Sequence, residues 1–163
     1  MLWRPAYVGL GSNLDDPAAR VRSACAALAR LSDCRLVARS RLWHSAPLGP
    51  ADQPDYVNAV AGLLTTLGPA ELLAELRALE ARLGKVAPPV RWGPRRIDLD
   101  LLLFGDLQLG TEALRLPHPG LHLRNFVLYP LAEVAPDLWV PGHGRVRALA
   151  ERVGSDGIRP FGA

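Results

Sequence analysis

The chain has 163 residues, of which 49% are hydrophobic and 21% are charged, an ordinary composition for one globular domain. It shows no run of about 18 apolar residues and no charged start before a long apolar stretch, so neither a membrane span nor a secretory signal is predicted. We therefore expect a cytoplasmic protein without membrane contacts. The formal net charge of +3 is a mild basic excess, which permits a polyanionic partner without requiring one.

The cysteine content is low. Cys25 and Cys34 lie in no CxxC or Cys/His pattern, and a pair this sparse argues against both a disulfide framework and a zinc site. We expect two reduced thiols in a single domain that spans residues 1–163.

The N-terminal part of the chain predicts a strand followed by a helix. The strand covers residues 4–10 and ends at the turn-forming cluster of residues 11–13, Gly-Ser-Asn. The helix then starts with Asp16 as its N-cap and Pro17 at its first position. Apolar residues recur at helical spacing from Val21 onward, which predicts that one helix face is buried.

The middle of the chain predicts two strands and a second helix. The strands cover residues 36–44 and 56–66, and a loop at 45–55 with three prolines separates them. Pro69 opens the helix, whose leucines form one apolar face, and Gly84 ends it.

After a loop rich in helix and strand breakers, residues 97–104 predict another strand, IDLDLLLF. The order β-α-β-β-α-β is typical of an α+β, ferredoxin-like sandwich, in which an antiparallel sheet carries two helices on one face. A hairpin at 108–115 and short helices at 126–134 and 148–153 would be C-terminal additions to this core.

Two acidic residues of this last strand are the first candidates for chemistry. Asp98 and Asp100 are two residues apart, so they project from one face of the strand at a Cα separation of about 7 Å. Such a pair could bind magnesium ions, and Arg91, Arg95 and Arg96 directly precede it as candidate phosphate ligands. An exposed edge strand is the ordinary explanation of an isolated D-x-D pattern.

Further candidates lie on either side of this strand. Prolines hold His118 in the segment Leu-Pro-His-Pro, where its imidazole could donate to a phosphate. Tyr56 and Asn58 share one strand face, and with Trp92 they could form a pocket for a flat, nitrogen-rich ring. Each of these residues could also be an ordinary packing or loop residue.

Four segments together resemble the hydroxymethyl-dihydropterin pyrophosphokinase family along nearly the whole chain: YVGLGSN, SAPLGPADQPDYVNAV, RWGPRRIDLDLLLFG and LPHPGLHLRNFVLYPLAEVAP. The resemblance implies an enzyme that uses ATP and two Mg²⁺ ions to transfer pyrophosphate to 6-hydroxymethyl-7,8-dihydropterin in folate biosynthesis. It implies AMP and the pterin diphosphate as products, a monomer, and no nucleic-acid partner.

The family's functional residues carry over by position in the matching motifs. The metal ligands implied are Asp98 and Asp100. The catalytic residues implied are Arg95, Asp98, Asp100 and Lys85. The ATP contacts implied are Lys85, His118, Arg124, Arg77 and Glu80. The pterin contacts implied are Ser45, Leu48, Tyr56, Asn58, Trp92, Arg95 and Phe126.

The chain departs from the family pattern at a few positions. Lys85 stands where many members have arginine, and the following segment 87–90, Ala-Pro-Pro-Val, replaces a more polar stretch. Arg77 replaces a common glutamine on the second predicted helix. The segments 45–55 and 85–95 resemble the family's mobile catalytic loops.

Two other functions fit parts of the sequence. A ferredoxin-like RNA-binding module would suit the inferred topology and the basic charge, but two acids occupy the central strand where aromatic residues would stack on bases. A metal-dependent glycosyltransferase could use the D-x-D pair, but 163 residues is short for that class.

Overall fold

The computed structural model describes residues 2–47, 52–84 and 97–162. Its centre is an antiparallel sheet. The strands follow one another in the order β10 (Ile158–Pro160), β3 (Trp43–Ser45), β4 (Tyr56–Thr65), β1 (Arg4–Ser12) and β5 (Asp98–Phe104). The strand β2 (Cys34–Arg39) pairs with the second half of β4, beyond the part that β3 occupies. The strand β5 therefore forms one end of the sheet.

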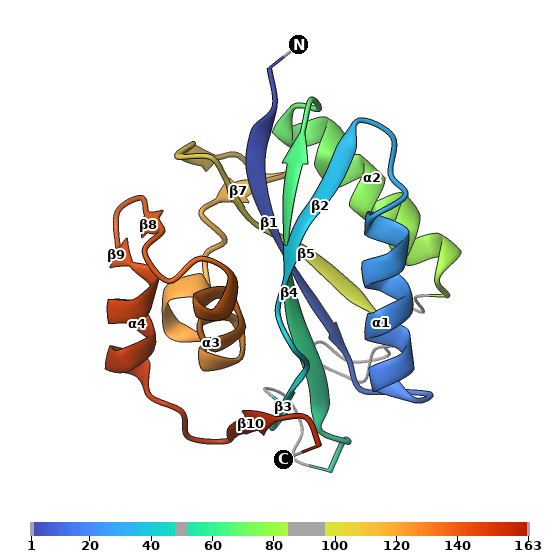
Figure 1. The fold of residues 1–163 in the computed structure, drawn as a ribbon, viewed down its shortest axis with the longest axis vertical. Helices are drawn as coiled ribbons and strands as arrows, with labels where there is room; N and C mark the ends of the chain where they lie inside the picture. Colours follow the sequence, from blue (N-terminus) through green and yellow to red (C-terminus); the bar gives the residue numbers. More distant parts are fainter. Residues whose placement is uncertain (1, 48–51, 85–96, 163) are drawn as a thin grey trace.

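Two helices, α1 (Pro17–Leu28) and α2 (Pro69–Arg82), cover one face of the sheet, at the right in Figure 1. Their apolar side chains pack on alternate residues of β1 and β5, such as Val8 and Leu99, which are fully buried. Asp16 caps α1 as predicted, since its Oδ1 accepts a hydrogen bond from Ala19 N at 3.4 Å. This face is a closed apolar core.

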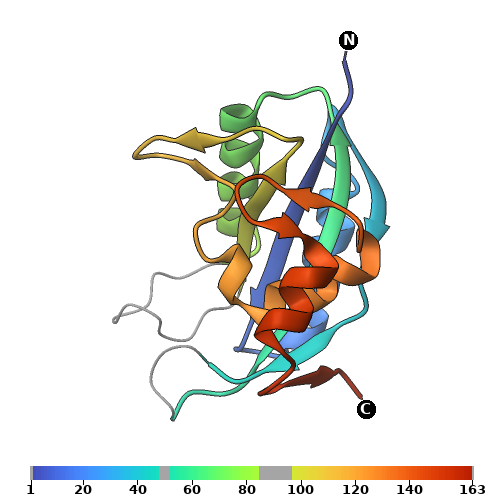
Figure 2. The same ribbon diagram turned by 90° about the vertical axis from the view of Figure 1, so that its left-hand side faces the viewer.

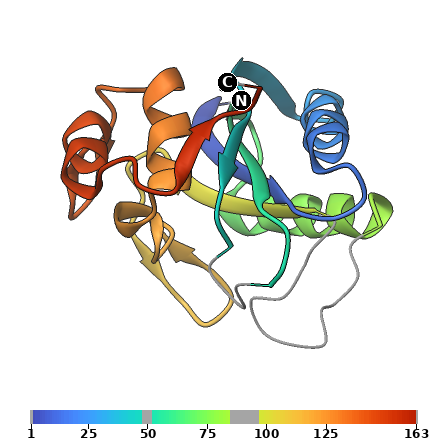
Figure 3. The same ribbon diagram turned by 90° about the horizontal axis from the view of Figure 1, so that it is seen from below.

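The C-terminal part of the chain covers half of the opposite face. Helices α3 (Asn125–Val134) and α4 (Val146–Val153) lie there, in front of the sheet in Figure 2 and on its left side in Figure 3. The fully buried Leu128 of α3 packs in one cluster with Val60 and Leu102 of the sheet. Smaller elements connect these helices: β6 (Leu109–Gly110), β7 (Arg115–Leu116), the 3₁₀ helix η1 (Leu121–Leu123), β8 (Trp139–Val140) and β9 (Gly144–Arg145).

The structure confirms the predicted α+β class, the antiparallel sheet, the hairpin and the C-terminal helices. Helices on one face were predicted, and α1 and α2 follow that prediction, but α3 and α4 add a third layer on the other face (Figure 3). Within the described ranges, no helix has both the length and the apolar character needed to cross a bilayer.

Two boundary predictions were wrong. The first strand does not end before Gly11, because β1 continues to Ser12 and Gly11 pairs with both Asn58 and Asp98. The strand predicted at 36–44 is interrupted after β2, where Ser40 Oγ accepts a hydrogen bond from Val60 N at 2.9 Å. The serine side chain there takes the place of a backbone acceptor, so the regular strand pairing stops.

Candidate active site

We call the sheet face that carries α3 and α4 the α3 face. A cavity of about 420 Å³ opens on the half of this face that the two helices leave uncovered. Strands β1, β4 and β5 form its floor, and β3, α3 and the loop before η1 form its walls. The predicted site residues that line this cavity are Ser45, Tyr56, Asn58, Arg77, Asp98, Asp100, His118, Arg124 and Phe126. Residues from distant parts of the sequence therefore meet in one place.

The other predicted site residues are elsewhere. Leu48, Lys85, Trp92 and Arg95 lie outside the described residues, so their roles remain predictions. Glu80 is described and is 2% exposed, but it is not among the residues that line the cavity.

Two glycines keep part of the cavity floor free of side chains. Gly9 pairs with Asp100, and Gly11 pairs with Asp98 on one side and Asn58 on the other. A Cβ atom on Gly11 would lie only 3.1 Å from Asn58 Oδ1, so any larger residue would narrow the space between the amide and the acids. Sequence analysis missed this role because a glycine before a Ser-Asn pair is typical of a turn.

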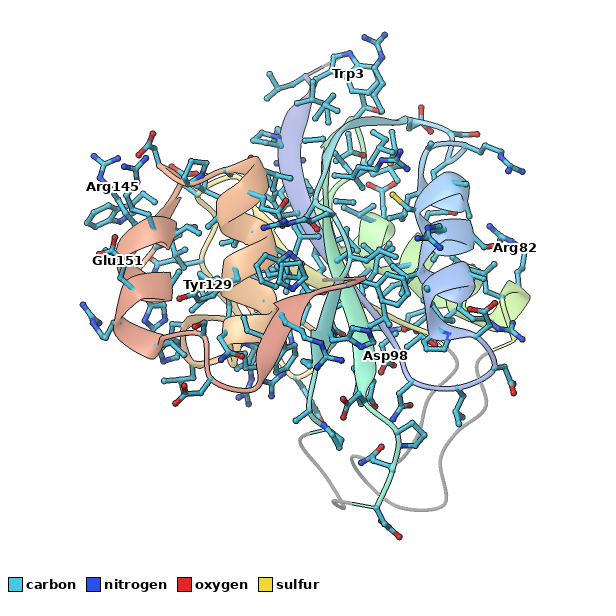
Figure 4. The ribbon with its side chains drawn as sticks, turned by 60° about the horizontal axis from the view of Figure 1, so that its bottom comes forward. Trp3, Arg82, Asp98, Tyr129, Arg145 and Glu151 are labelled. Atoms are coloured by element: carbon cyan, nitrogen blue, oxygen red, sulfur yellow. The ribbon has the colours of Figure 1, made fainter. Side chains whose placement is uncertain are left out.

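The acid pair projects from β5 into the cavity. Asp98 and Asp100 share the cavity face of the strand and are half-buried, whereas Leu99 between them points into the opposite core. Figure 4 labels Asp98 at the lower end of the sheet. Carboxylate oxygens are the ligands that Mg²⁺ takes from proteins when phosphate oxygens and water complete its octahedral shell, so this donor set fits the predicted metal.

His118 is held as a neutral hydrogen-bond donor. Its backbone N–H donates to Leu102 O at 2.9 Å, and its Nδ1 accepts from Gly120 N at 3.1 Å, which leaves the ring proton on Nε2. Burial lowers the pKa of His118; the charge of Asp100 opposes this shift, and Arg124 and Arg77 add to it. A neutral imidazole with an Nε2–H group can donate to a phosphate oxygen.

Gly120 makes room for Arg124. A Cβ atom at Gly120 would lie 2.5 Å from both Cζ and Nε of Arg124, too close for any real contact. The guanidinium group therefore lies against the loop backbone at the cavity wall. No local signal in the sequence could reveal this packing, because it depends on where the chain folds back before α3.

The opposite side of the cavity carries the aromatic and amide groups. Asn58 Nδ2 donates to Ser45 Oγ at 2.6 Å, and both side chains are buried. This bond orients the Asn58 amide so that Oδ1 lies over Gly11. Tyr56 from β4 and Phe126 from α3 supply rings to the same cavity, which gives it surfaces for a planar ligand.

Polar contacts at both ends of α3 fix the position of Phe126. At the start of the helix, Asn125 Nδ2 donates to Gly154 O at 3.0 Å and to Asp156 O at 2.7 Å. At its end, Glu133 accepts hydrogen bonds from Trp43 Nε1 and from Arg41 Nε. The helix is thus tied to β3, the strand that carries Ser45.

An enzyme that transfers phosphate-containing groups is the class that this cavity defines, since an acid pair with the donor atoms that Mg²⁺ prefers and the arginines Arg77 and Arg124 face a pocket for a flat molecule. The family model of 7,8-dihydro-6-hydroxymethylpterin-pyrophosphokinase (HPPK) matches residues 7–136. The chain belongs to this family, and it is a pyrophosphokinase, an enzyme of the transferase class.

Named relatives agree with the family match. The chain is 49% identical over 152 residues to the 2-amino-4-hydroxy-6-hydroxymethyldihydropteridine pyrophosphokinase of Pseudomonas aeruginosa, covering 93% of each chain. It is 45% identical over 147 residues to the enzyme of the same name from Haemophilus influenzae, covering 90% of this chain and 91% of that one. It is also 34% identical over 157 residues to the folic acid synthesis protein fol1 of Schizosaccharomyces pombe, covering 96% of this chain and 21% of that protein.

Solved structures share the fold. A Plasmodium falciparum HPPK-DHPS crystal structure with pterin and p-hydroxybenzoate superposes with a TM-score of 0.68 at 14% identity, over 93% of this chain and 43% of that chain. A second HPPK-DHPS structure, in complex with substrates, gives a TM-score of 0.77 at 9% identity over 98% of this chain and 47% of that one. The chain spans less than half the length of these two proteins, and the likeness concerns the fold alone.

Proposed function

We propose that the chain transfers a pyrophosphoryl group from ATP to the hydroxyl of 6-hydroxymethyl-7,8-dihydropterin, a step of folate biosynthesis. The products are AMP and the pterin diphosphate. Family membership and the names of the relatives support this reaction. The observation that carries it is that the acid pair, His118 and Arg124 share one cavity with the aromatic and amide groups.

In this proposal Asp98 and Asp100 hold two magnesium ions, which neutralise the negative charge of the nucleotide phosphates. His118 donates its Nε2–H group to a phosphate oxygen, and Arg124 binds the phosphates as a fork of N–H donors. These contacts fix the phosphate chain beside the acids. Phosphoryl transfer needs little covalent chemistry from the protein, so positioning and charge neutralisation are its main contributions.

The pterin occupies the other side of the cavity in this proposal. Tyr56 and Phe126 contact the faces of its ring, and Asn58 Oδ1, oriented by the bond to Ser45, accepts a hydrogen bond from the ring edge. The hydroxymethyl oxygen then attacks the β-phosphorus as the bond from that phosphorus to the oxygen retained by AMP breaks. Leu48 and Trp92 complete the pterin pocket, and Arg95 and Lys85 bind phosphate.

The proposal also covers four general properties of the protein: its fold class, domain organisation, oligomeric state and compartment. We assign the β1-α1-β2-β4-α2-β5 core to the ferredoxin-like class, because its order β2-β4-β1-β5 is the order expected for that fold. The chain acts as a single domain over residues 1–163 and as a monomer. Its compartment is the cytoplasm, which suits the two buried and unpaired cysteines Cys25 and Cys34.

Product analysis tests the reaction. Purified protein is incubated with ATP, Mg²⁺ and 6-hydroxymethyl-7,8-dihydropterin, and we expect AMP in an amount equal to the pterin diphosphate. Asp98→Ala and Asp100→Ala should lose turnover by about a thousandfold or more, since each removes a charge-neutralising group at the reacting phosphates. Asp106→Ala, an exposed position just beyond β5, is the matched control and should react at the wild-type rate. ADP as the product, or normal turnover in both site variants, would contradict the proposal.

A further inference from the structure

Arg77, Glu80 and Leu99 form a closed ring of hydrogen bonds at the outer edge of β5. Glu80 Oε2 accepts from Leu99 N at 2.8 Å. Arg77 Nη1 donates to Leu99 O at 2.9 Å and to Glu80 Oε1 at 2.8 Å, which closes the ring. Both side chains come from one turn of α2, three residues apart. We call this arrangement the Arg77–Glu80 clip.

The clip bonds to the backbone of Leu99, the residue that separates Asp98 from Asp100. Leu99 pairs with Leu10 of β1 on its inner side, and β5 is the last strand of the sheet on its outer side. The outward-facing N–H and C=O groups of Leu99 would meet a neighbouring strand in the middle of a sheet. Here two side chains of α2 take that place, so the backbone is held between Asp98 and Asp100.

Stability alone is a poor explanation for the clip. Glu80 is 2% exposed, and burying a carboxylate costs free energy that an ion pair offsets only with good geometry. An apolar side chain packed on α2 would avoid the cost of burying a charge, although it would leave the N–H group of Leu99 without its acceptor. What an apolar side chain cannot do is bond both backbone groups of Leu99 and so fix the local strand geometry.

We propose that the Arg77–Glu80 clip is a positioning unit that sets the separation and direction of the Asp98 and Asp100 carboxylates before the metal-bound nucleotide arrives. This inference rests on the proposed function, because it assumes that these carboxylates bind metal. It changes the role expected for Glu80 from an ATP contact to a contact with the strand. Arg77 lines the cavity as well, so its guanidinium group both holds β5 and adds positive charge near the phosphates.

The sharpest variant is Glu80→Gln. It keeps the size of the side chain, but its NH₂ group must face either Arg77 Nη1 or Leu99 N–H, and two donors cannot bond each other. The clip therefore opens at one contact. Glu75→Gln is the matched control, because it removes the same charge from an exposed position on the same helix.

Two measurements test the clip and the acids separately: one reports whether the clip is intact, and the other reports how well the acids bind Mg²⁺. Amide hydrogen exchange by NMR reports on Leu99, and we expect faster exchange at residues 98–100 in Glu80→Gln and wild-type exchange in Glu75→Gln. Calorimetric titration of an unreactive ATP analogue, with a methylene group between the α- and β-phosphates, gives the Mg²⁺ concentration for half-maximal binding. We expect this concentration to rise about tenfold in Glu80→Gln, the usual effect of losing a residue that orients a metal ligand.

Pterin affinity separates positioning from general damage to the fold. Measured with saturating Mg²⁺ and analogue, it should stay within about twofold of wild type in Glu80→Gln, since Tyr56, Asn58 and Phe126 are not attached to the clip. A parallel loss of metal, nucleotide and pterin binding would overturn the inference, and so would an unchanged Mg²⁺ requirement despite faster exchange at Leu99. If Glu80→Gln does not fold, Glu80→Asp keeps the charge but shortens the side chain by one methylene group, which opens the same ring, and Glu75→Asp is its control.

Failure of the proposed function would look different. It would appear in the wild-type protein as an absence of AMP with the pterin substrate. Failure of the clip would appear as equal Mg²⁺ requirements in the wild type and Glu80→Gln, whatever the wild type produces.

Discussion

The α3 face of the sheet has two halves, and the same three strands build both. In the closed half, under α3 and α4, the strands present Tyr7, Val60 and Leu102 to an apolar cluster. A few residues further along each strand, the open half presents glycines from β1, Tyr56 and Asn58 from β4, and the acid pair from β5. The change from apolar residues therefore comes at Gly9 in β1 and at Asp100 in β5, which pair with each other, and one residue pair later in β4, where Val60 still lies opposite Gly9.

This change of residue type shows how one surface can serve two purposes. The closed half needs large apolar side chains, because burial against the C-terminal helices stabilises the fold. The open half needs acids, an amide and empty space. None of these stabilises the fold as much as the buried apolar side chains of the closed half do. We therefore expect substitutions in the closed half to act on stability and substitutions in the open half to act on binding.

The largest effect on stability is expected for Leu128→Ala. Leu128 is fully buried in the closed half, so its truncation should lower the free energy of unfolding by about 2–5 kcal/mol through lost burial and a residual cavity. Urea unfolding measures the change. Leu123→Ala is the control, because Leu123 is 67% exposed and its truncation should cost less than about 0.5 kcal/mol. Equal effects in the two variants would show that the α3 cluster does not stabilise the fold.

An intermediate effect, on binding, is expected for Gly11→Ala. The added methyl group would press on Asn58 Oδ1 at 3.1 Å and occupy the floor of the open half. Pterin affinity should fall about tenfold, equivalent to about 1.4 kcal/mol, while the unfolding free energy changes by less. Isothermal titration with the pterin gives the affinity. Gly110→Ala in β6 meets nothing within 4 Å and should leave pterin binding unchanged. A stability loss without an affinity change would place Gly11 among purely structural residues.

The smallest effect is a pH dependence of the closed half. His122 of η1 stacks on His143 with ring centroids 3.9 Å apart, and burial, followed by the charge of His143, lowers the pKa of His122 below its ordinary value of 6.5. The unfolded chain then takes up this proton at a higher pH than the folded chain. Stability should therefore be complete above pH 6.5 and fall as the pH drops through 6.5 toward the lower folded pKa.

Unfolding curves at several pH values between 5 and 8 check this sign. His122→Gln removes the titrating group, so its stability should depend less steeply on pH than that of the wild type. A steeper dependence, or one that gains stability in acid, would contradict the depressed pKa of His122.

Much of the fold follows from sequence patterns that are local. The spacing of leucines and the breaker Gly84 predicted α2, and the alternation of residues in β5 placed Asp98 and Asp100 on one face. The same period of two placed Tyr56 and Asn58 together. These features depend only on the geometry of one helix or one strand, which neighbouring residues determine.

The features that the sequence did not predict depend on contacts between distant segments. Gly11 resembles a turn residue until the strand opposite it brings Asn58 close. Gly120 is needed only because Arg124 folds back on it, and Glu80 resembles a solvent-facing residue until Leu99 is placed beside it. In each case the partner lies on another element or beyond a turn, so no pattern along the chain identifies it.

The two ends of the main sheet also affect how the protein behaves at high concentration. An exposed end strand can recruit a strand from another molecule and start aggregation. At one end, the side chains of the Arg77–Glu80 clip already occupy the backbone groups of Leu99, near the start of β5. On the opposite side the sheet ends in two strands, β2 beside β4 and β10 beside β3. Of these, β10 has three residues and includes Pro160, a residue without an N–H group to offer. The contacts that order the acid pair thus also protect one sheet edge from edge-to-edge association.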